Sequence, residues 1–168
     1  MSEEYILNEH NKEEFPPSHT AEHLLNQVMV RMFDCERSGN AHIERKKSKI
    51  SWIVDHKPDR REEQDIERQM KELIEQDLPV TYEFLTREEI EVRIAESPAD
   101  SPYARLSLDR LPAGASDTIR LVSIGDFDVC PCIGKHVRST SQIGQFEMLG
   151  TNWDNEKHSF RVRYKIKP

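Results

Sequence analysis

Two short segments of the sequence, "HTAEH" and "CIGKH", carry side chains that can bind a metal ion. His19 and His23 are four residues apart, and side chains at this spacing lie on one face of an α-helix. Cys132 and His136 are also four apart. Gly134 stands between them and permits a tight turn that brings sulfur and imidazole toward one point. Thiolate and imidazole are typical zinc donors, so we predict one zinc site built from these four side chains.

The other two cysteines are weaker candidates as ligands. Cys130 precedes Cys132 by only two residues and remains its rival as the sulfur ligand. Cys35 lies at the end of the first predicted helix without a neighbouring donor, so we expect a structural role for it. Three cysteines with a C-P-C pair, in a chain without a signal-peptide pattern, indicate a metal or a reactive thiol more than a disulfide framework.

A second interpretation of "HTAEH" is the H-x-x-E-H motif of inverted zinc proteases. In that motif Glu22 would be the general base, and a distant acidic residue would be the third ligand. The chain is short for that architecture, and "CIGKH" would have no role in it. We therefore expect Glu22 to be an exposed helix residue that benefits from the positive end of the helix dipole.

The histidine pair requires a helix, which we predict from Ser18, as its N-cap, to about Asp34. At about 100° per residue, the apolar side chains of this helix form a stripe nearly opposite the two histidines. The imidazoles are thus free to face a more polar space while the stripe packs into a core. The stripe consists of Ala21, Leu24, Leu25, Val28 and Met32.

The rest of the chain predicts an α+β fold, with helices packed on a mostly antiparallel sheet in a single domain, residues 1–168. A polar lead-in occupies residues 1–15 and a proline-containing connection residues 96–116. A second helix over 59–79 has one apolar stripe, namely Ile66, Met70, Leu73 and Ile74. The remaining predictions are strands at 41–45, 48–56, 80–86 and 117–129, a short helix at 87–95, and a C-terminal hairpin with its turn near 152–157.

Alternation in the last strand predicts two different faces. Val162, Tyr164 and Ile166 share the side that belongs to a core, and the residues between them form a basic stripe. The basic residues are Arg161, Arg163, Lys165 and Lys167.

Composition limits the partners and the location. The 168 residues carry a net charge of −7, which at first argues against a nucleic-acid partner, and we expect no DNA partner. The last fifty residues and the segment "ERKKSK" are nevertheless locally basic. Such local basic surfaces can bind a polyanion weakly. No apolar run approaches the ~20 residues of a membrane span. The acidic N-terminus lacks a signal-peptide pattern, so we expect a cytoplasmic protein without a membrane partner.

The order and spacing of "HTAEHLL" and "C-x-G-x-H-V" resemble the editing domain of alanyl- and threonyl-tRNA synthetases. The resemblance is greatest to the freestanding alanyl-tRNA editing proteins of the AlaX type. Alanyl-type members read C-G-G-T-H where this chain has Ile133 and Lys135. Threonyl-type members have an aspartate two residues before the cysteine, where this chain has Cys130 and places Asp128 four before. These departures leave the amino-acid specificity open.

The resemblance implies a zinc-dependent hydrolase acting in trans on mischarged aminoacyl-tRNA, with Ser- or Gly-tRNA(Ala) as substrate. It also implies that the matching positions His19, His23, Cys132 and His136 hold the metal. Thr20 and Glu22 are then the candidate catalytic residues, and His42 is a candidate for the substrate pocket. Contacts to the tRNA acceptor end are assigned to Arg45, Lys46, Lys47, Lys49 and Lys135. The alternative is a non-catalytic zinc module that binds RNA or protein.

Overall fold

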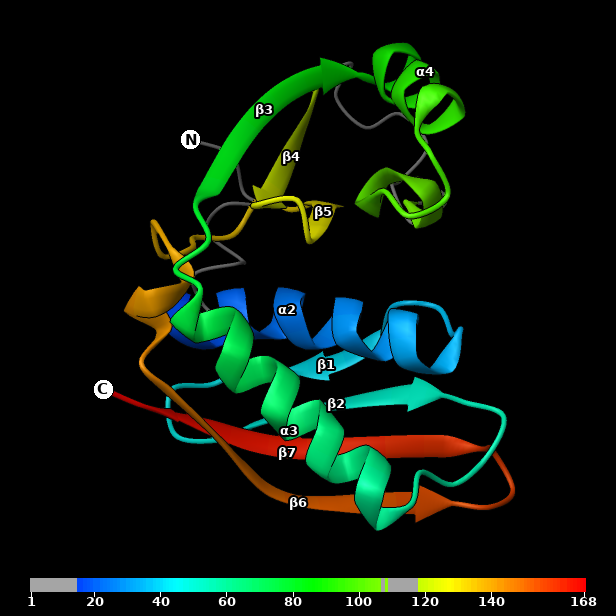
Figure 1. Ribbon diagram of the computed structural model, residues 1–168, viewed down its shortest axis with the longest axis vertical. Helices are drawn as coiled ribbons and strands as arrows, with labels where there is room; N and C mark the ends of the chain where they lie inside the picture. Colours follow the sequence, from blue (N-terminus) through cyan, green and yellow to red (C-terminus); the bar gives the residue numbers. More distant parts are fainter. Residues whose placement is uncertain (1–14, 107, 109–117) are drawn as a thin grey trace, which may run out of the picture.

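Two antiparallel sheets lie on opposite sides of one helix in the computed structural model, which describes residues 15–106, 108 and 118–168 (Figure 1). The four-stranded sheet has the order β1 (Asn40–His42), β2 (Ser48–Ile53), β7 (Ser159–Lys167), β6 (Gln145–Asp154). The three-stranded sheet has the order β3 (Val80–Thr86), β4 (Thr118–Ile124), β5 (Asp128–Pro131). The helices are α2 (Pro16–Phe33), α3 (Arg60–Glu75) and α4 (Arg87–Glu96), with 3-10 turns η1 (Pro102–Arg105) and η2 (Thr140–Ile143). The α+β prediction is confirmed, with two sheets instead of one.

The start of α2 differs from the prediction that Ser18 caps it. The helix begins at Pro16, with Phe15 in the N-cap position. Proline suits the first helical positions because its φ is already helical and it has no N–H to leave unpaired. Two consecutive prolines therefore start the helix earlier, and Ser18 lies inside it with a buried hydroxyl that has no hydrogen-bond partner among the described residues.

The helix α2 is buried on nearly all sides. The predicted apolar stripe is confirmed as core, since Leu24, Leu25 and Val28 are fully buried against the four-stranded sheet and α3. The opposite side is covered by the three-stranded sheet (Figure 1), which the sequence pattern did not indicate. Gln27 on that side donates to the carbonyl of Phe127 at 2.9 Å. The polar side of α2 therefore faces another layer of the protein.

The helix α3 follows its predicted pattern. Asp59 and Glu62 form a capping box at its start. All four predicted stripe residues are buried and pack on the core shared with α2. The helix ends at Glu75, before Pro79 is reached.

The prediction of one strand over residues 117–129 is wrong. The segment forms β4 and β5, which pair antiparallel with each other. Gly125 between them has a φ of 50°, which glycine adopts without the steric cost of a side chain. The predicted strand and helix after Pro79 are confirmed as β3 and α4, whose Leu85 and Ile90 form a second small core with β4 and β5.

The C-terminal hairpin of β6 and β7 is confirmed. Val162 and Tyr164 are fully buried, and α2 and α3 pack on that inner side of the four-stranded sheet. The basic residues of β7 point to the outer side, on which no helix of the described residues lies. We call this outer side the open face.

Two further predictions fall partly outside the described residues. Of the polar lead-in over residues 1–15, only Phe15 is described. Of the proline-containing connection over 96–116, residues 107 and 109–116 lie outside the described ranges. Within the described ranges, none of the helices has both the length and the apolarity that a bilayer crossing requires.

Candidate metal centre

The four predicted ligands come together between α2 and the segment after β5. One possible ligand atom from each of His19, His23, Cys132 and His136 lies within 4.8 Å of the others. The His19 and His136 rings stack at 4.3 Å between centroids, and the His23 ring meets them edge-on. The Cys132 sulfur is 3.4 Å from Nε2 of His19. We call these four residues the His/Cys group.

Gly134 is required by close approach between the two halves of the group. A Cβ atom at this position would lie 2.1 Å from Cε1 of His19, so either the imidazole or the segment would have to move. The backbone N–H of Gly134 also donates to the Cys132 sulfur at 3.4 Å. The glycine therefore lets the segment lie directly on the His19 imidazole, whose Nδ1 is 3.2 Å from the Lys135 carbonyl oxygen.

Arg120 of β4 fixes the segment from the other side. Its guanidinium donates to the carbonyls of Cys132 and Gly134 and lies 4.7 Å from the centre of the Tyr82 ring. That ring is 6.5 Å from the His136 ring. Neither motif signals Arg120, because its place beside them depends on the pairing of β4 with β5.

Thr20 orients His136. The backbone N–H of Val137 donates to its hydroxyl oxygen at 3.2 Å, and Nδ1 of His136 lies 2.9 Å from the same oxygen. When Nδ1 donates this hydrogen bond, the Nε2 lone pair is left for a metal ion. Nε2 of His136 is buried without a hydrogen-bond partner in the described structure, which fits a role as a metal ligand.

A buried ion pair lies behind His23. Arg37 donates to the fully buried Asp128 at 2.6 and 3.3 Å, and more weakly to the His23 carbonyl oxygen at 3.5 Å. One carboxylate oxygen of Asp128 is 3.8 Å from Nδ1 of His23. The sequence offered Asp128 only as a displaced counterpart of a family aspartate, and it offered no signal for Arg37.

The electrostatics favour neutral imidazoles. Burial lowers the pKa of His23 well below its usual value. Burial, with help from His19 and Arg120, lowers the pKa of His136 to about 3. Neutral imidazole is the form that binds metal. Burial raises the pKa of the Cys132 thiol, so a bound metal would have to displace its proton.

Glu22 does not lie where we expected it. Its side chain is only 19% exposed, and its Oε1 lies 3.6 Å from Nε2 of His19. Asn26 donates to the other carboxylate oxygen at 3.1 Å. Burial raises the pKa of Glu22 to about 7, with Arg37 opposing the rise and Asp128 adding to it. A carboxyl group that titrates near neutrality thus stands at the His/Cys group.

The remaining cysteines lie outside the group. The Cys130 thiol donates to the Pro131 carbonyl at 3.5 Å, and burial raises its pKa to about 12. Cys35 donates to the carbonyl of Met29 at 3.5 Å and packs against the core, in keeping with a structural role.

The predicted RNA contacts lie in two places. Lys135 belongs to the segment of the His/Cys group itself. The basic island of Arg45, Lys46, Lys47 and Lys49 joins β1 to β2. Its Arg45 lies 4.4 Å from the centre of the Phe15 ring, so the island meets the end of α2 that carries the two histidines. His42 is paired with Glu44 at 2.8 Å and is not a member of the group.

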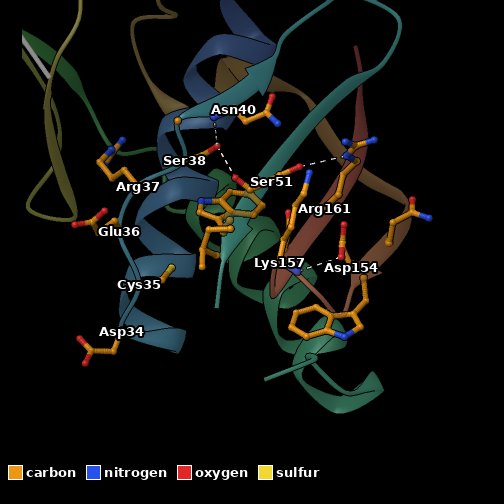
Figure 2. Close-up of a pocket in the computed structure, with 16 residues that line it drawn as sticks. Asp34, Cys35, Glu36, Arg37, Ser38, Asn40, Ser51, Asp154, Lys157 and Arg161 are labelled. Atoms are coloured by element: carbon orange, nitrogen blue, oxygen red, sulfur yellow. Dashed lines mark hydrogen bonds between the residues drawn. The ribbon is translucent and has the colours of Figure 1, made fainter. Parts of the chain in front are cut away.

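A cavity of about 880 Å³ opens near the other end of α2 (Figure 2). Its walls come from the segment after α2 and from β2, β6 and β7. None of its lining residues belongs to the His/Cys group, so the cavity is separate from the candidate metal centre.

The chain is similar in sequence to proteins that edit tRNA or charge it. A domain family described as the threonyl and alanyl tRNA synthetase second additional domain matches residues 119–161, which include Cys132 and His136. An alanyl-tRNA editing protein, AlaX-L of Pyrococcus horikoshii, is 29% identical over 87% of this chain and 32% of its own length. The chain is homologous to this editing protein and to the corresponding region of alanyl- and threonyl-tRNA synthetases.

The synthetase relatives are of similar identity and much greater length. Threonine–tRNA ligase 1 of Bacillus subtilis is 30% identical over 80% of this chain and 21% of its own length. Alanine–tRNA ligase of Methanococcus vannielii is 26% identical over 86% of this chain and 15% of its own length. The chain therefore spans about a third, or less, of these relatives.

Proposed function

We propose that the chain hydrolyses the ester bond of mischarged aminoacyl-tRNA in trans, with Ser- or Gly-tRNA(Ala) as the preferred substrates. The observation that carries this proposal is the convergence of His19, His23, Cys132 and His136 in a chain homologous to an alanyl-tRNA editing protein. We propose Zn²⁺ as the metal, since three imidazoles and one thiolate form a zinc donor set. The unpartnered Nε2 of His136 fits this assignment.

A bound zinc ion would act as a Lewis acid and lower the pKa of a coordinated water. Among the chain's own residues, we assign the general base to Glu22. Its carboxylate takes a proton from the attacking water as the water oxygen bonds to the ester carbonyl carbon. The bond from that carbon to the ribose oxygen then breaks, and Glu22 returns the proton to the leaving ribose oxygen, which becomes the free hydroxyl. A pKa of about 7 suits this exchange near neutral pH.

Approach of the substrate follows from the burial of the group. The His23 side is closed by Asp128 and Arg37, whereas the side chains of His19 and Glu22 keep 23% and 19% of their exposure. The aminoacyl ester therefore enters past His19 and Glu22. Thr20 acts by holding the His136 ring, since its hydroxyl is bonded to that ring and to the backbone.

The basic island and Lys135 are proposed to bind phosphates of the tRNA acceptor end, with His42 at the margin of the approach. Phosphate contacts position an RNA and carry no sequence information. The support is the contact between Arg45 and Phe15, which brings the island to the histidine end of α2.

A second candidate is a non-catalytic zinc module that binds RNA or protein. It is favoured by the number of ligands, because four protein ligands usually form a closed, structural zinc site.

One experiment separates these functions. Purified protein is assayed for bound metal and for deacylation of Ser-tRNA(Ala), Gly-tRNA(Ala) and mischarged threonine-type tRNA. Deacylation with stoichiometric zinc supports the enzyme, and zinc without deacylation supports the non-catalytic module. Cys132→Ala is expected to lose metal and activity together, and Cys130→Ala is the matched control that keeps both. Peptide cleavage that depends on Glu22 would instead favour the protease interpretation.

A further inference from the structure

The open face of the four-stranded sheet is strongly basic. Paired residues of an antiparallel sheet lie on the same face, so the strand register places the basic residues of β7 beside Lys49 of β2. The acidic residues among them are Glu147 and Asp154 of β6. Two lysines share Glu147, with both Lys165 and Lys167 at 3.4 Å from its carboxylate. The basic residues are Lys49, Arg161, Arg163, Lys165 and Lys167.

Arg163 is held flat on this face by the shape of the backbone. A β-bulge between Met148 and Gly150 places the glycine opposite Arg163. A Cβ atom on Gly150 would lie 2.4 Å from Nη2 of the guanidinium, so the arginine lies across the glycine. Nε of Arg163 is buried without a hydrogen-bond partner in the described structure. The bulge thus fixes the position of the Arg163 guanidinium, and the N–H at Nε makes no hydrogen bond to the described residues.

Neutral hydrogen-bonding groups stand among these charges. Figure 2 shows Arg161, whose Nε donates to the Ser51 hydroxyl at 3.2 Å. Asn152 of β6 lies opposite Arg161, and Asn40 of β1 lies opposite Ser51. Both asparagines line the cavity. Serine and asparagine side chains, with arginine and lysine, supply most contacts to phosphate and sugar in nucleic-acid complexes.

The open face continues to the candidate metal centre along the edge of the sheet. Lys49 is the last residue of the basic island. The island's Arg45 lies against Phe15 at the start of α2. A basic surface therefore runs from the histidine end of α2, around the β1–β2 connection, to β7. Alternate residues along β7 extend it by roughly 20 Å from Arg161 to Lys167.

We propose that the open face binds the phosphate backbone of the tRNA beyond its acceptor end, so that the RNA passes from the candidate metal centre around the β1–β2 connection to the outer side of the four-stranded sheet. The inference rests on the proposed function for the identity of the RNA. Charge complementarity carries it, because rows of arginine and lysine among serine and asparagine match a sugar–phosphate chain. A lipid surface would call for an apolar, inserted side, whereas the described face consists mainly of charged and amide or hydroxyl groups.

The test uses the full chain and an unmodified tRNA(Ala) transcript, with binding followed by fluorescence anisotropy from low to high salt. We expect Arg161→Gln/Arg163→Gln to weaken binding about tenfold at moderate salt and to reduce the salt slope by about two. Gly150→Ala keeps every charge but displaces the Arg163 guanidinium, so its slope is expected to fall by about one. The matched control is Arg61→Gln/Lys71→Gln, which removes two exposed charges from α3 and should leave both quantities unchanged.

The outcomes separate this surface from the proposed function. Loss of tRNA affinity in the double variant, with metal content unchanged, supports the surface even if no variant deacylates tRNA. Affinity and slope equal to wild type, or no tRNA binding by the wild type, would overturn it. Binding of the wild type to vesicles of phosphatidylserine and phosphatidylcholine, lost in the double variant while tRNA affinity is kept, would assign the face to a membrane instead.

Discussion

Gly134 and His19 approach so closely that the backbone of one lies on the imidazole of the other, although 115 residues separate them in the chain. Two segments that are individually unremarkable in sequence thereby become one donor set. The contact also makes the geometry of the group sensitive to a single methyl group.

Gly134→Ala should therefore weaken metal binding without unfolding the protein. The new methyl group would lie 2.1 Å from Cε1 of His19, so either the imidazole or the segment must move. We expect at least a tenfold loss of zinc or cobalt affinity in a metal titration. Ile133→Ala, at a side chain 81% exposed, is the control and should bind metal as wild type does. Equal affinities for the two variants would contradict this account of the glycine.

Removal of one partner of the buried Arg37–Asp128 pair should be costly. Asp128→Ala leaves a guanidinium without its counter-charge, and such losses amount to about 3–5 kcal/mol for buried pairs. We expect Arg37→Ala to cost at least as much, because it leaves the fully buried Asp128 carboxylate without its partner, whereas the Arg37 side chain left by Asp128→Ala is 21% exposed. Urea denaturation of the two single variants and the double variant measures the coupling. A double variant whose loss equals the sum of the singles would show that the pair does not act as a unit.

Thr20→Val should lower metal affinity because it removes the oxygen to which the His136 ring and Val137 are bonded. Loss of such supporting hydrogen bonds typically costs about 10–100-fold in affinity. Thr20→Ser keeps the hydroxyl and should recover most of the affinity. A cobalt absorption spectrum provides the readout, since it reports the ligand geometry. If the valine variant has the spectrum and the metal affinity of wild type, Thr20 does not support the metal centre.

The raised pKa of Glu22 should make the free energy of unfolding of the metal-free protein depend on pH. Burial raises its pKa from 4.5 to about 7, so the folded state binds more protons than the unfolded state between these values. Stability from this group is full below pH 4.5 and is lost as pH rises through about 7. Glu22→Gln should be more stable than wild type by about 3 kcal/mol above that range. Denaturation at several pH values tests this, with the exposed Glu91→Gln as a control that should change little.

The elements predicted best are those whose signal is local. The capping box and stripe of α3, the hairpin of β6 and β7, and the two donor motifs each depend on residues a few positions apart. The prediction that Ser18 caps α2 is wrong because the prolines before it fix the helix start more strongly than a capping side chain does. The strand over 117–129 failed at Gly125, where a positive φ reverses the chain.

The features that could not be predicted depend on contacts far apart in sequence. The burial of Glu22 and of the polar side of α2 requires a second sheet above the helix, which periodicity within α2 does not indicate. Arg120 reaches the His/Cys group only through strand pairing, and Arg37 meets Asp128 across 91 positions of the chain. A single sequence contains no local trace of such pairs.

The enclosure of α2 between two sheets has a mechanical consequence. Half of the His/Cys group belongs to the helix and half to the segment that leaves β5. A metal ion held there would cross-link the three-stranded layer to the helix at one corner. Hydrogen exchange after chelation should then accelerate in β4 and β5 more than in the hairpin of β6 and β7. The ion would then set the stability of the contact between the three-stranded sheet and α2, whatever chemistry it performs.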